Sequence, residues 1–193
     1  LMDVVRKGAF AYDSATKDDP VTAAGFDTWR TIVRSLREDL RKNNWKSVSE
    51  SNLDKTVNEE FGISIVCTSG NAAVGHADRT LLSKNDKGGT IERTLEQNRR
   101  QFDMFEDDFR TSPTDSNPTW MLVHHIDKNA REIRAELSLP FSLTDKRRIG
   151  EWQTRIMLGT VSLDNLKTTV LHTEENFTEE VAIPVIRKES KNE

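Results

Sequence analysis

Four arginines recur at helical spacing early in the chain, and their guanidinium groups are suited to binding phosphate. Arg30, Arg34, Arg37 and Arg41 follow one another at steps of four, three and four residues, which aligns them along one side of a helix. A guanidinium can hold a phosphate with two parallel hydrogen bonds, and a row of them attracts nucleic acid whatever its sequence. The alternatives are a solvated helix surface, softened by an ion pair between Glu38 and Arg34, or a contact with an acidic protein segment.

A glycine-containing loop followed by a helix is a second candidate site for an anion. The residues that would form it are Lys84, Lys87, Gly88, Gly89 and Thr90. Backbone amides at a helix N-terminus bind anions, and glycine lets a ligand approach the backbone closely. The lysines precede the glycines, so the order is neither that of a P-loop nor that of a dinucleotide-binding loop. A segment as long as 68–90 without periodic pattern is also typical of a plain connection or a disordered loop.

Two adjacent histidines invite comparison with metal-dependent nucleases. His124, His125 and Asp127, followed by Asn165 and His172, have a residue order that resembles the HNH nuclease motif, in which histidines act as general base and metal ligand. However, Asn165 lies 40 residues after His125, which is farther than the hairpin of that motif places it. The local sequence also alternates like a strand, so adjacent histidines would point to opposite faces. We therefore favour histidines that are hydrogen-bonded within a sheet.

Three carboxylates near the same hairpin would suit magnesium. Asp127, Glu132 and Glu136 supply the oxygen ligands that a hard cation prefers. The restriction-endonuclease signature needs a lysine two residues after a carboxylate on the second strand, and this chain has Arg134 and Ser138 at those positions. Ion pairing across a solvated sheet face accounts for these residues without catalysis. We assign no metal ligand, and a metal-dependent nuclease or phosphodiesterase using these carboxylates and a histidine is kept as an alternative function.

The composition narrows the classes of protein further. The chain has 193 residues, of which 31% are charged, and a formal net charge of -4, which suits one globular domain with a large polar surface. The single cysteine, Cys67, excludes an intramolecular disulfide and a Cys-rich zinc site, and its apolar surroundings favour a core position. No apolar run reaches the roughly 18 residues of a membrane span. We expect a cytoplasmic protein with no membrane partner, no cofactor and no assigned catalytic residue.

Helical periodicity is confined to the first part of the chain. Residues 1–24 lack a periodic apolar pattern and are predicted to form an irregular arm. A helix of about 20 residues follows and ends near Asn43-Asn44, with an apolar stripe roughly opposite the arginine row. The stripe consists of Phe26, Trp29, Val33, Leu36 and Leu40. Thr90 is the expected cap of a second helix, whose shared face contains Ile91, Leu95, Phe102 and Phe105.

One strand is predicted within the helix-rich first half, and strand patterns dominate the second half. The β-branched run 62–67 is bounded by glycines, as buried strands are. Residues 120–126 and 132–139 alternate between apolar and polar on either side of a turn, which predicts a hairpin. Further strand candidates lie at 151–159, 168–172 and 179–187.

These elements predict an α+β fold in which amphipathic helices pack on a mainly antiparallel sheet of about five strands. We expect a single domain over residues 1–193. It would comprise the irregular arm at 1–24, a helix-rich half at 25–118 with one strand and a long loop, and a strand-rich half at 119–193.

The basic residues decide the leading functional hypothesis. We expect a non-enzymatic interaction domain that presents a basic patch to an anionic partner, either nucleic acid or another polyanion. The four arginines and the five loop residues named above are its predicted binding residues. A protein-binding subunit of a larger assembly is a further alternative, in which Trp45 and Trp152 would anchor the interface unless they pack in the core.

Overall fold

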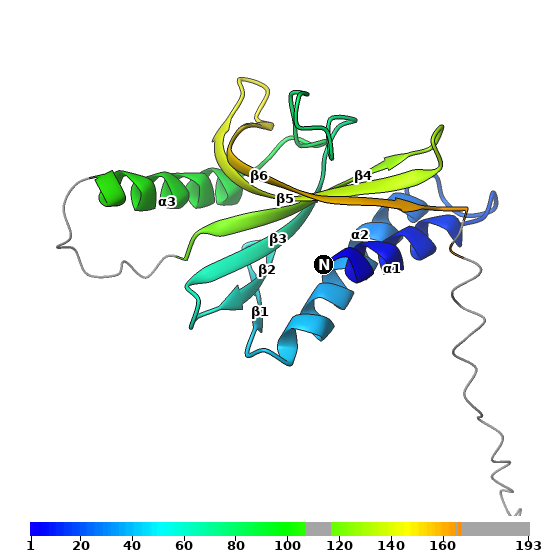
Figure 1. Ribbon diagram of the computed structural model, residues 1–193, viewed down its shortest axis with the longest axis horizontal. Helices are drawn as coiled ribbons and strands as arrows, with labels where there is room; N and C mark the ends of the chain where they lie inside the picture. The colour runs from blue at the N-terminus through cyan, green and yellow to red at the C-terminus, as the bar shows by residue number, and fades with distance from the viewer. Residues whose placement is uncertain (107–116, 165, 167–193) are drawn as a thin grey trace, which may run out of the picture.

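The computed structural model describes residues 1–106, 117–164 and 166, with side chains described up to residue 100 in the first of these ranges (Figure 1). The helices of this part of the chain are α1 (Met2–Asp13), α2 (Ala23–Arg41) and α3 (Gly89–Glu106). Its strands are β1 (Lys46–Glu50), β2 (Leu53–Asn58), β3 (Ile63–Ser69), β4 (Thr119–Asp127), β5 (Glu132–Leu143) and β6 (Ile149–Ser162).

The strands form one six-stranded sheet whose spatial order is the order in the sequence. Each neighbouring pair is antiparallel except β3 and β4, which run parallel because α3 lies in the connection between them. A parallel pair needs such a crossover, whereas the antiparallel pairs are joined by short turns. The predicted α+β fold with helices on a mainly antiparallel sheet is therefore confirmed, with six strands in place of about five.

Helices cover both faces of the sheet, and each face has its own core (Figure 1). The pair α1 and α2 packs on one face, where Ile32 and Leu36 meet Leu122 and Ile133. On the other face, α3 and the long loop before it bury Leu95 against Met121 and Val123 of β4. Adjacent residues of β4 therefore enter different cores, which is the alternation that the sequence predicted for this segment.

The first long helix was predicted correctly, but its arginines lie elsewhere around it than expected. Val33 and Leu36 of the apolar stripe are buried, and the backbone at Asn44 turns left-handed just beyond the helix end. Each arginine comes one residue after a stripe position, and one residue corresponds to about 100° of rotation. The row therefore flanks the stripe rather than opposing it, and it shares a groove with Trp29 and Val33.

The predicted irregular arm at 1–24 is wrong for its first half, because residues 2–13 form α1. The buried face of α1 is made of Val4, Val5, Gly8 and Ala9, so its apolar signal is short and comes from small side chains. A Cβ atom at Gly8 would lie 2.4 Å from Ile32 Cγ1. This close approach to α2 shows that α1 is stabilised by helix packing, which a search for a long apolar stripe does not detect.

The segment after α2 forms a hairpin that was not predicted from the sequence. Strands β1 and β2 pair in antiparallel register through a tight turn at Ser51 and Asn52, both of which have positive φ. Every residue of β1 is exposed, so this strand has no buried side to produce an apolar alternation. The described part of the expected helix-rich half, for which one strand was predicted, therefore contains three strands.

The remaining predicted elements differ mainly at their ends. The runs 62–67, 120–126, 132–139 and 151–159 are confirmed as parts of β3, β4, β5 and β6. The second helix is confirmed, but it begins at Gly89, so Thr90 lies in its first turn and donates its hydroxyl to the Ser51 carbonyl at 3.3 Å. The strand candidates at 168–172 and 179–187 lie outside the described residues. Among the helices of the described ranges, none has the length and apolar character needed to cross a membrane.

Candidate functional site

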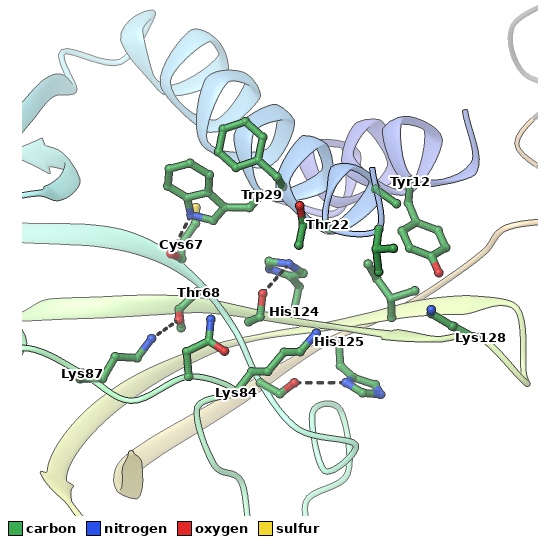
Figure 2. Close-up of a pocket in the computed structure, with 18 residues that line it drawn as sticks. Tyr12, Thr22, Trp29, Cys67, Thr68, Lys84, Lys87, His124, His125 and Lys128 are labelled. Atoms are coloured by element: carbon green, nitrogen blue, oxygen red, sulfur yellow. Dashed lines mark hydrogen bonds between the residues drawn. The ribbon is translucent and has the colours of Figure 1, made fainter. Parts of the chain in front are cut away.

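A cavity of about 640 Å³ opens where the parallel strands β3 and β4 end, between the sheet and the α1–α2 pair (Figure 2). We call it the lysine cavity after Lys84, Lys87 and Lys128, which line it. Its other lining residues are Tyr12, Val21, Thr22, Ala24, Gly25, Phe26, Trp29, Cys67, Thr68, Ser69, Gly70, Asn85, His124, His125 and Ile126. Its volume lies in the range of small-molecule binding sites.

The unequal lengths of two parallel strands create this cavity. Strand β3 ends at Ser69, whereas β4 continues to Asp127, and the last residues of β4 therefore border an open space. At Gly70 the chain leaves the sheet so sharply that an added Cβ atom would lie 2.5 Å from Val74 and 2.8 Å from Val123. Carboxyl ends of parallel strands are a common place for ligand crevices in sheets, because the chain turns away there.

Buried charges hold the long loop 70–88 against the sheet. The carboxylate of Glu136 is fully buried, and it accepts hydrogen bonds from Arg155 at 2.7 and 2.9 Å and from the backbone amide of Gly75 at 2.9 Å. Arg155 also donates to the carbonyls of Ala73 and His76. Because buried charges require such partners, this network specifies one conformation of the loop. The loop is thus an ordered part of the fold.

The part of the loop that carries the lysines is tied down at each end. The Lys84 amide donates to the Ser69 carbonyl at 2.8 Å, and the Ser83 amide donates to the Ile149 carbonyl at 3.0 Å. The Lys87 amide donates a hydrogen bond to the Arg147 carbonyl, and the Arg147 guanidinium donates one back to the Lys87 carbonyl. These bonds join the end of β3 to the start of β6. The lysines therefore stand on a backbone that is held in place by two strands.

Within the part of the chain that the structure describes, the charge of the lysine cavity is uncompensated. Its lining contains no Asp or Glu, and within the described residues no carboxylate lies within 4 Å of Lys84, Lys87 or Lys128. Lys87 is half-buried, donates from Nζ to the hydroxyl of Thr68 at 2.8 Å, and has its pKa lowered by that burial. A cation that loses water without gaining a carboxylate is left free to bind an anionic ligand.

The two histidines point to opposite sides of β4, as the sequence predicted (Figure 2). His124 faces the helices, is only 2% exposed, and lies with Nε2 3.2 Å from the Ser69 hydroxyl. Its Nδ1 atom is buried without a hydrogen-bond partner. Burial first, and then the charges of Lys84 and His125, lower the pKa of His124 to about 4, so the ring is neutral at pH 7.

His125 is held from the other side by a backbone carbonyl. Its Nδ1 lies 3.1 Å from the carbonyl oxygen of Gly70, which can only accept, so Nδ1 carries the proton and Nε2 of the neutral ring is an acceptor. Burial is the largest influence on His125 and lowers its pKa. Both rings are therefore neutral near pH 7, and the positive charge of the cavity comes from the lysines.

The wall formed by α2 adds an aromatic surface and a helix N-terminus. The indole of Trp29 is fixed by a hydrogen bond of 3.3 Å from Nε1 to the Cys67 carbonyl, and the Phe26 ring, 57% exposed, lies 5.8 Å from it. The cap residue Thr22 makes no side-chain capping bond, and the first turn of α2 has no acidic residue. The partial positive charge of the helix N-terminus is thus open toward the cavity, whose lining includes Ala24 and Gly25.

The predicted arginine row lines a second, separate hollow of about 300 Å³. We call it the arginine groove, and it is lined by Trp29, Arg30, Val33, Arg34, Arg37, Glu38, Arg41 and Asp54. Arg30 is paired with Asp27 at 2.9 Å, and Arg37 with Asp54 at 3.1 Å. Arg34 and Arg41 are exposed and make no ion pair with a described residue, so the expected pair of Arg34 with Glu38 is absent. Half of the row is compensated by the chain's own carboxylates.

The carboxylates considered for a metal site have structural partners. Glu136 is closed by Arg155, Glu132 pairs with Arg134 at 2.7 Å, and Asp127 accepts the turn amides of Asn129 and Ala130. The described residues contain no group of three His, Cys, Asp or Glu side chains arranged for a metal ion. Asn165 and His172, the other members of the nuclease comparison, lie outside the described residues.

The cysteine and the two tryptophans that the sequence singled out also have structural roles in packing. Cys67 is buried, and desolvation raises the pKa of its thiol to about 12, which makes it a poor nucleophile. The Trp152 indole donates to the Leu81 carbonyl at 3.0 Å and packs on the core of the α3 face, and Trp45 packs on the core of the other face.

The structure divides the predicted binding residues into three sets. Lys84 and Lys87 line the lysine cavity, the four arginines line the arginine groove, and the remaining three lie outside both hollows: Gly88, Gly89 and Thr90. The sequence reading did not assign Lys128, His124 or Trp29 to an anion site. A lone lysine after a strand and a tryptophan in an apolar stripe carry no such signal, because only the fold brings them together.

Comparison with known proteins adds no assignment: no protein-family model, curated protein or solved structure matches this chain.

Proposed function

We propose that this domain binds a phosphate-bearing anion in the lysine cavity. One observation carries the proposal: three lysines from two separate segments line a cavity to which the described residues contribute no carboxylate. Gathering like charges without counter-ions costs electrostatic free energy, and an anionic ligand would remove that cost. This narrows the interaction hypothesis drawn from the sequence to one site.

The chemistry of the remaining lining supports a phosphate group in particular. The open N-terminus of α2 and the hydroxyl of Ser69, which points to the same face of the sheet as His124, are donors that phosphate oxygens accept well. Lys87 is already oriented by Thr68, so part of its conformational entropy is lost before binding. The aromatic wall of Phe26 and Trp29 provides an apolar surface for the rest of the ligand.

The test uses inorganic pyrophosphate as the probe, in calorimetric titrations at low ionic strength. We expect binding at neutral pH that weakens as salt is added. Lys84→Met and Lys87→Met should each lower the affinity by about tenfold or more, because a hydrogen bond to a charged group contributes about 1.5 to 3 kcal/mol.

Lys146→Met is the matched control, because it removes one exposed lysine from the turn before β6, outside the cavity. The net charge changes equally in all three variants. The proposal predicts nearly unchanged affinity for Lys146→Met. Equal losses in the three variants, or no measurable pyrophosphate binding to the unmodified protein, would refute it.

A further inference from the structure

The lysine cavity and the arginine groove share one wall residue, Trp29. The cavity lies at the N-terminal end of α2, and the groove follows the same helix toward its C-terminal end, where it reaches Asp54 of β2. Figure 1 shows α2 running from the side of β4 toward β1, so that the two hollows follow one another along a single helix. A ligand longer than the cavity therefore has a cationic path on which to continue.

We propose that this path binds single-stranded nucleic acid that carries a terminal phosphate. The terminal phosphate occupies the lysine cavity, and the following phosphates lie along Arg30, Arg34 and Arg41. This inference rests on the proposed function and names the class of ligand for the same site.

Charge supports a polyanion on this path. The cavity contributes three lysines without a carboxylate, and Arg34 and Arg41 make no ion pair with any residue that the structure describes. Glu38 and Asp54 also line the groove and reduce its attraction. The groove alone is thus a moderate site for phosphate, whereas the cavity at its end is a strong one. A strand held at one end by its terminal phosphate uses both.

The aromatic pair at the junction favours a single strand over a duplex. The Phe26 ring is 57% exposed and lies beside Trp29, at an angle of 42° between the ring planes. Bases of a single strand are free to stack on such rings, and this contact is tolerant of sequence. In a duplex the bases are stacked and paired with each other. Both side chains line the cavity, and Figure 2 shows that of Trp29 projecting from α2 toward Cys67.

The length of the path predicts how many nucleotides it holds. With a rise of 1.5 Å per residue, Arg30 and Arg41 are about 16 Å apart along the helix axis. A stacked strand advances about 3.4 Å per nucleotide, so about five nucleotides cover this distance. Because the terminal phosphate lies in the cavity, before Arg30, we expect affinity to rise with length until the strand covers this stretch and about five nucleotides more, and then to level off.

The experiment measures fluorescence anisotropy with labelled oligothymidylates of about two, five, ten and twenty nucleotides. Each length is tested with a 5′-phosphate, with a 3′-phosphate and with neither. A phosphate at one of the two ends should increase affinity about tenfold, and Lys84→Met should abolish that increase. The twenty-nucleotide probe should bind no more than about twofold tighter than the ten-nucleotide probe, apart from the statistical gain of a longer lattice.

The groove is tested with the double variant Arg34→Gln and Arg41→Gln. It should lose the gain between two and ten nucleotides and retain pyrophosphate binding. Its control is Arg93→Gln with Arg100→Gln, which removes two exposed arginines at the same spacing from α3, on the opposite face of the sheet. That control should keep the length dependence.

The outcomes separate this inference from the function on which it rests. Pyrophosphate binding without tighter binding of the ten-nucleotide probe would refute the inference and leave the proposed function standing. Equal binding of a blunt duplex, or no effect of a phosphate at either end, would also refute the inference. Failure of pyrophosphate to bind would refute both.

Discussion

The two cationic hollows on either side of Trp29 differ in how their charges are compensated. The arginine groove has four arginines, yet two of them are paired with Asp27 and Asp54, and Glu38 also lies in its lining. The lysine cavity has three lysines, and no carboxylate of residues 1–106, 117–164 or 166 lies in its lining. The region with more basic residues is therefore the one whose charge is more nearly neutralised.

This difference follows from where the residues of each hollow come from. Residues on one helix lie near carboxylates three or four positions away, as Arg30 lies near Asp27, and such pairs form readily. The lysines come from a loop and from the end of β4, and the fold decides which residues surround them. Counting basic residues in a sequence overestimates the first kind of site and overlooks the second.

The largest expected effect is on the free energy of unfolding, and it compares the loss of a buried ion pair with the loss of a less buried one. Arg155→Met leaves the buried carboxylate of Glu136 without its cation, which should lower the free energy of unfolding by about 3 to 5 kcal/mol. Arg37→Met breaks the partly buried pair with Asp54 in the arginine groove, whose side chains keep some solvent contact, and should cost less, about 1 kcal/mol. Chemical denaturation of both variants measures the two values. Similar losses would contradict the view that the loop, and with it the lysine cavity, depends on the buried pair.

The second prediction concerns pH. The folded state protonates His124 only near pH 4, whereas the unfolded chain does so near pH 6.5, so the unfolded state binds more protons between these values. Stability should therefore fall as the pH is lowered from 7 to 4.5, with His124 contributing about 2 to 3 kcal/mol of the loss. His124→Gln should remove this contribution, and thermal unfolding of both proteins across that range measures it. A loss of the same size in the variant would show that other groups cause it.

A third experiment would raise the available charge of the arginine groove. Asp54→Asn removes the partner of Arg37, and we expect oligothymidylate affinity to increase about two- to fivefold at low salt because the freed guanidinium can bind phosphate. Pyrophosphate affinity should stay the same, since Asp54 does not line the lysine cavity. Parallel titrations with the two probes measure the effect. Stronger pyrophosphate binding would indicate that the two hollows are not independent.

The smallest effect is expected for two glycines that sequence reasoning assigned to the anion site. A Cβ atom added at Gly88 or Gly89 would have no heavy atom within 4 Å, and neither residue lines the cavity. Gly88→Ala and Gly89→Ala should change pyrophosphate binding and stability by no more than about 0.5 kcal/mol. A loss of pyrophosphate affinity in either variant would extend the site to the start of α3.

The fold was predictable where local pattern is strong. The stripe of α2 and the alternation of β4 and β5 repeat over enough residues to reveal helix and strand. Helix α1 and strand β1 were missed, because α1 is held by close packing at Gly8 and β1 has no buried side. Their stability comes from contacts with distant parts of the chain, which leave little trace in the local sequence.

The candidate site was predictable only in part. Lys84 and Lys87 were identified from their loop, but they were expected to form an anion site with the N-terminus of α3. The helix N-terminus that lines the cavity is that of α2. Lys128 and His124 could not be added, because a residue's neighbours in space depend on strand pairing. The parallel register of β3 with β4 places Ser69 beside His124, 55 residues away in the chain.

The amino-acid sequence alone determined the periodic elements and the fold class, because helical and strand periods arise from the backbone geometry of neighbouring residues. It also determined which basic side chains are present. The tertiary structure decided which of those basic side chains have no carboxylate beside them among the described residues. The crossover through α3, the early end of β3 and the buried Glu136–Arg155 pair together bring lysines from a loop and from β4 beside the N-terminus of α2. Electrostatic free energy depends on distances in space, and the fold sets those distances.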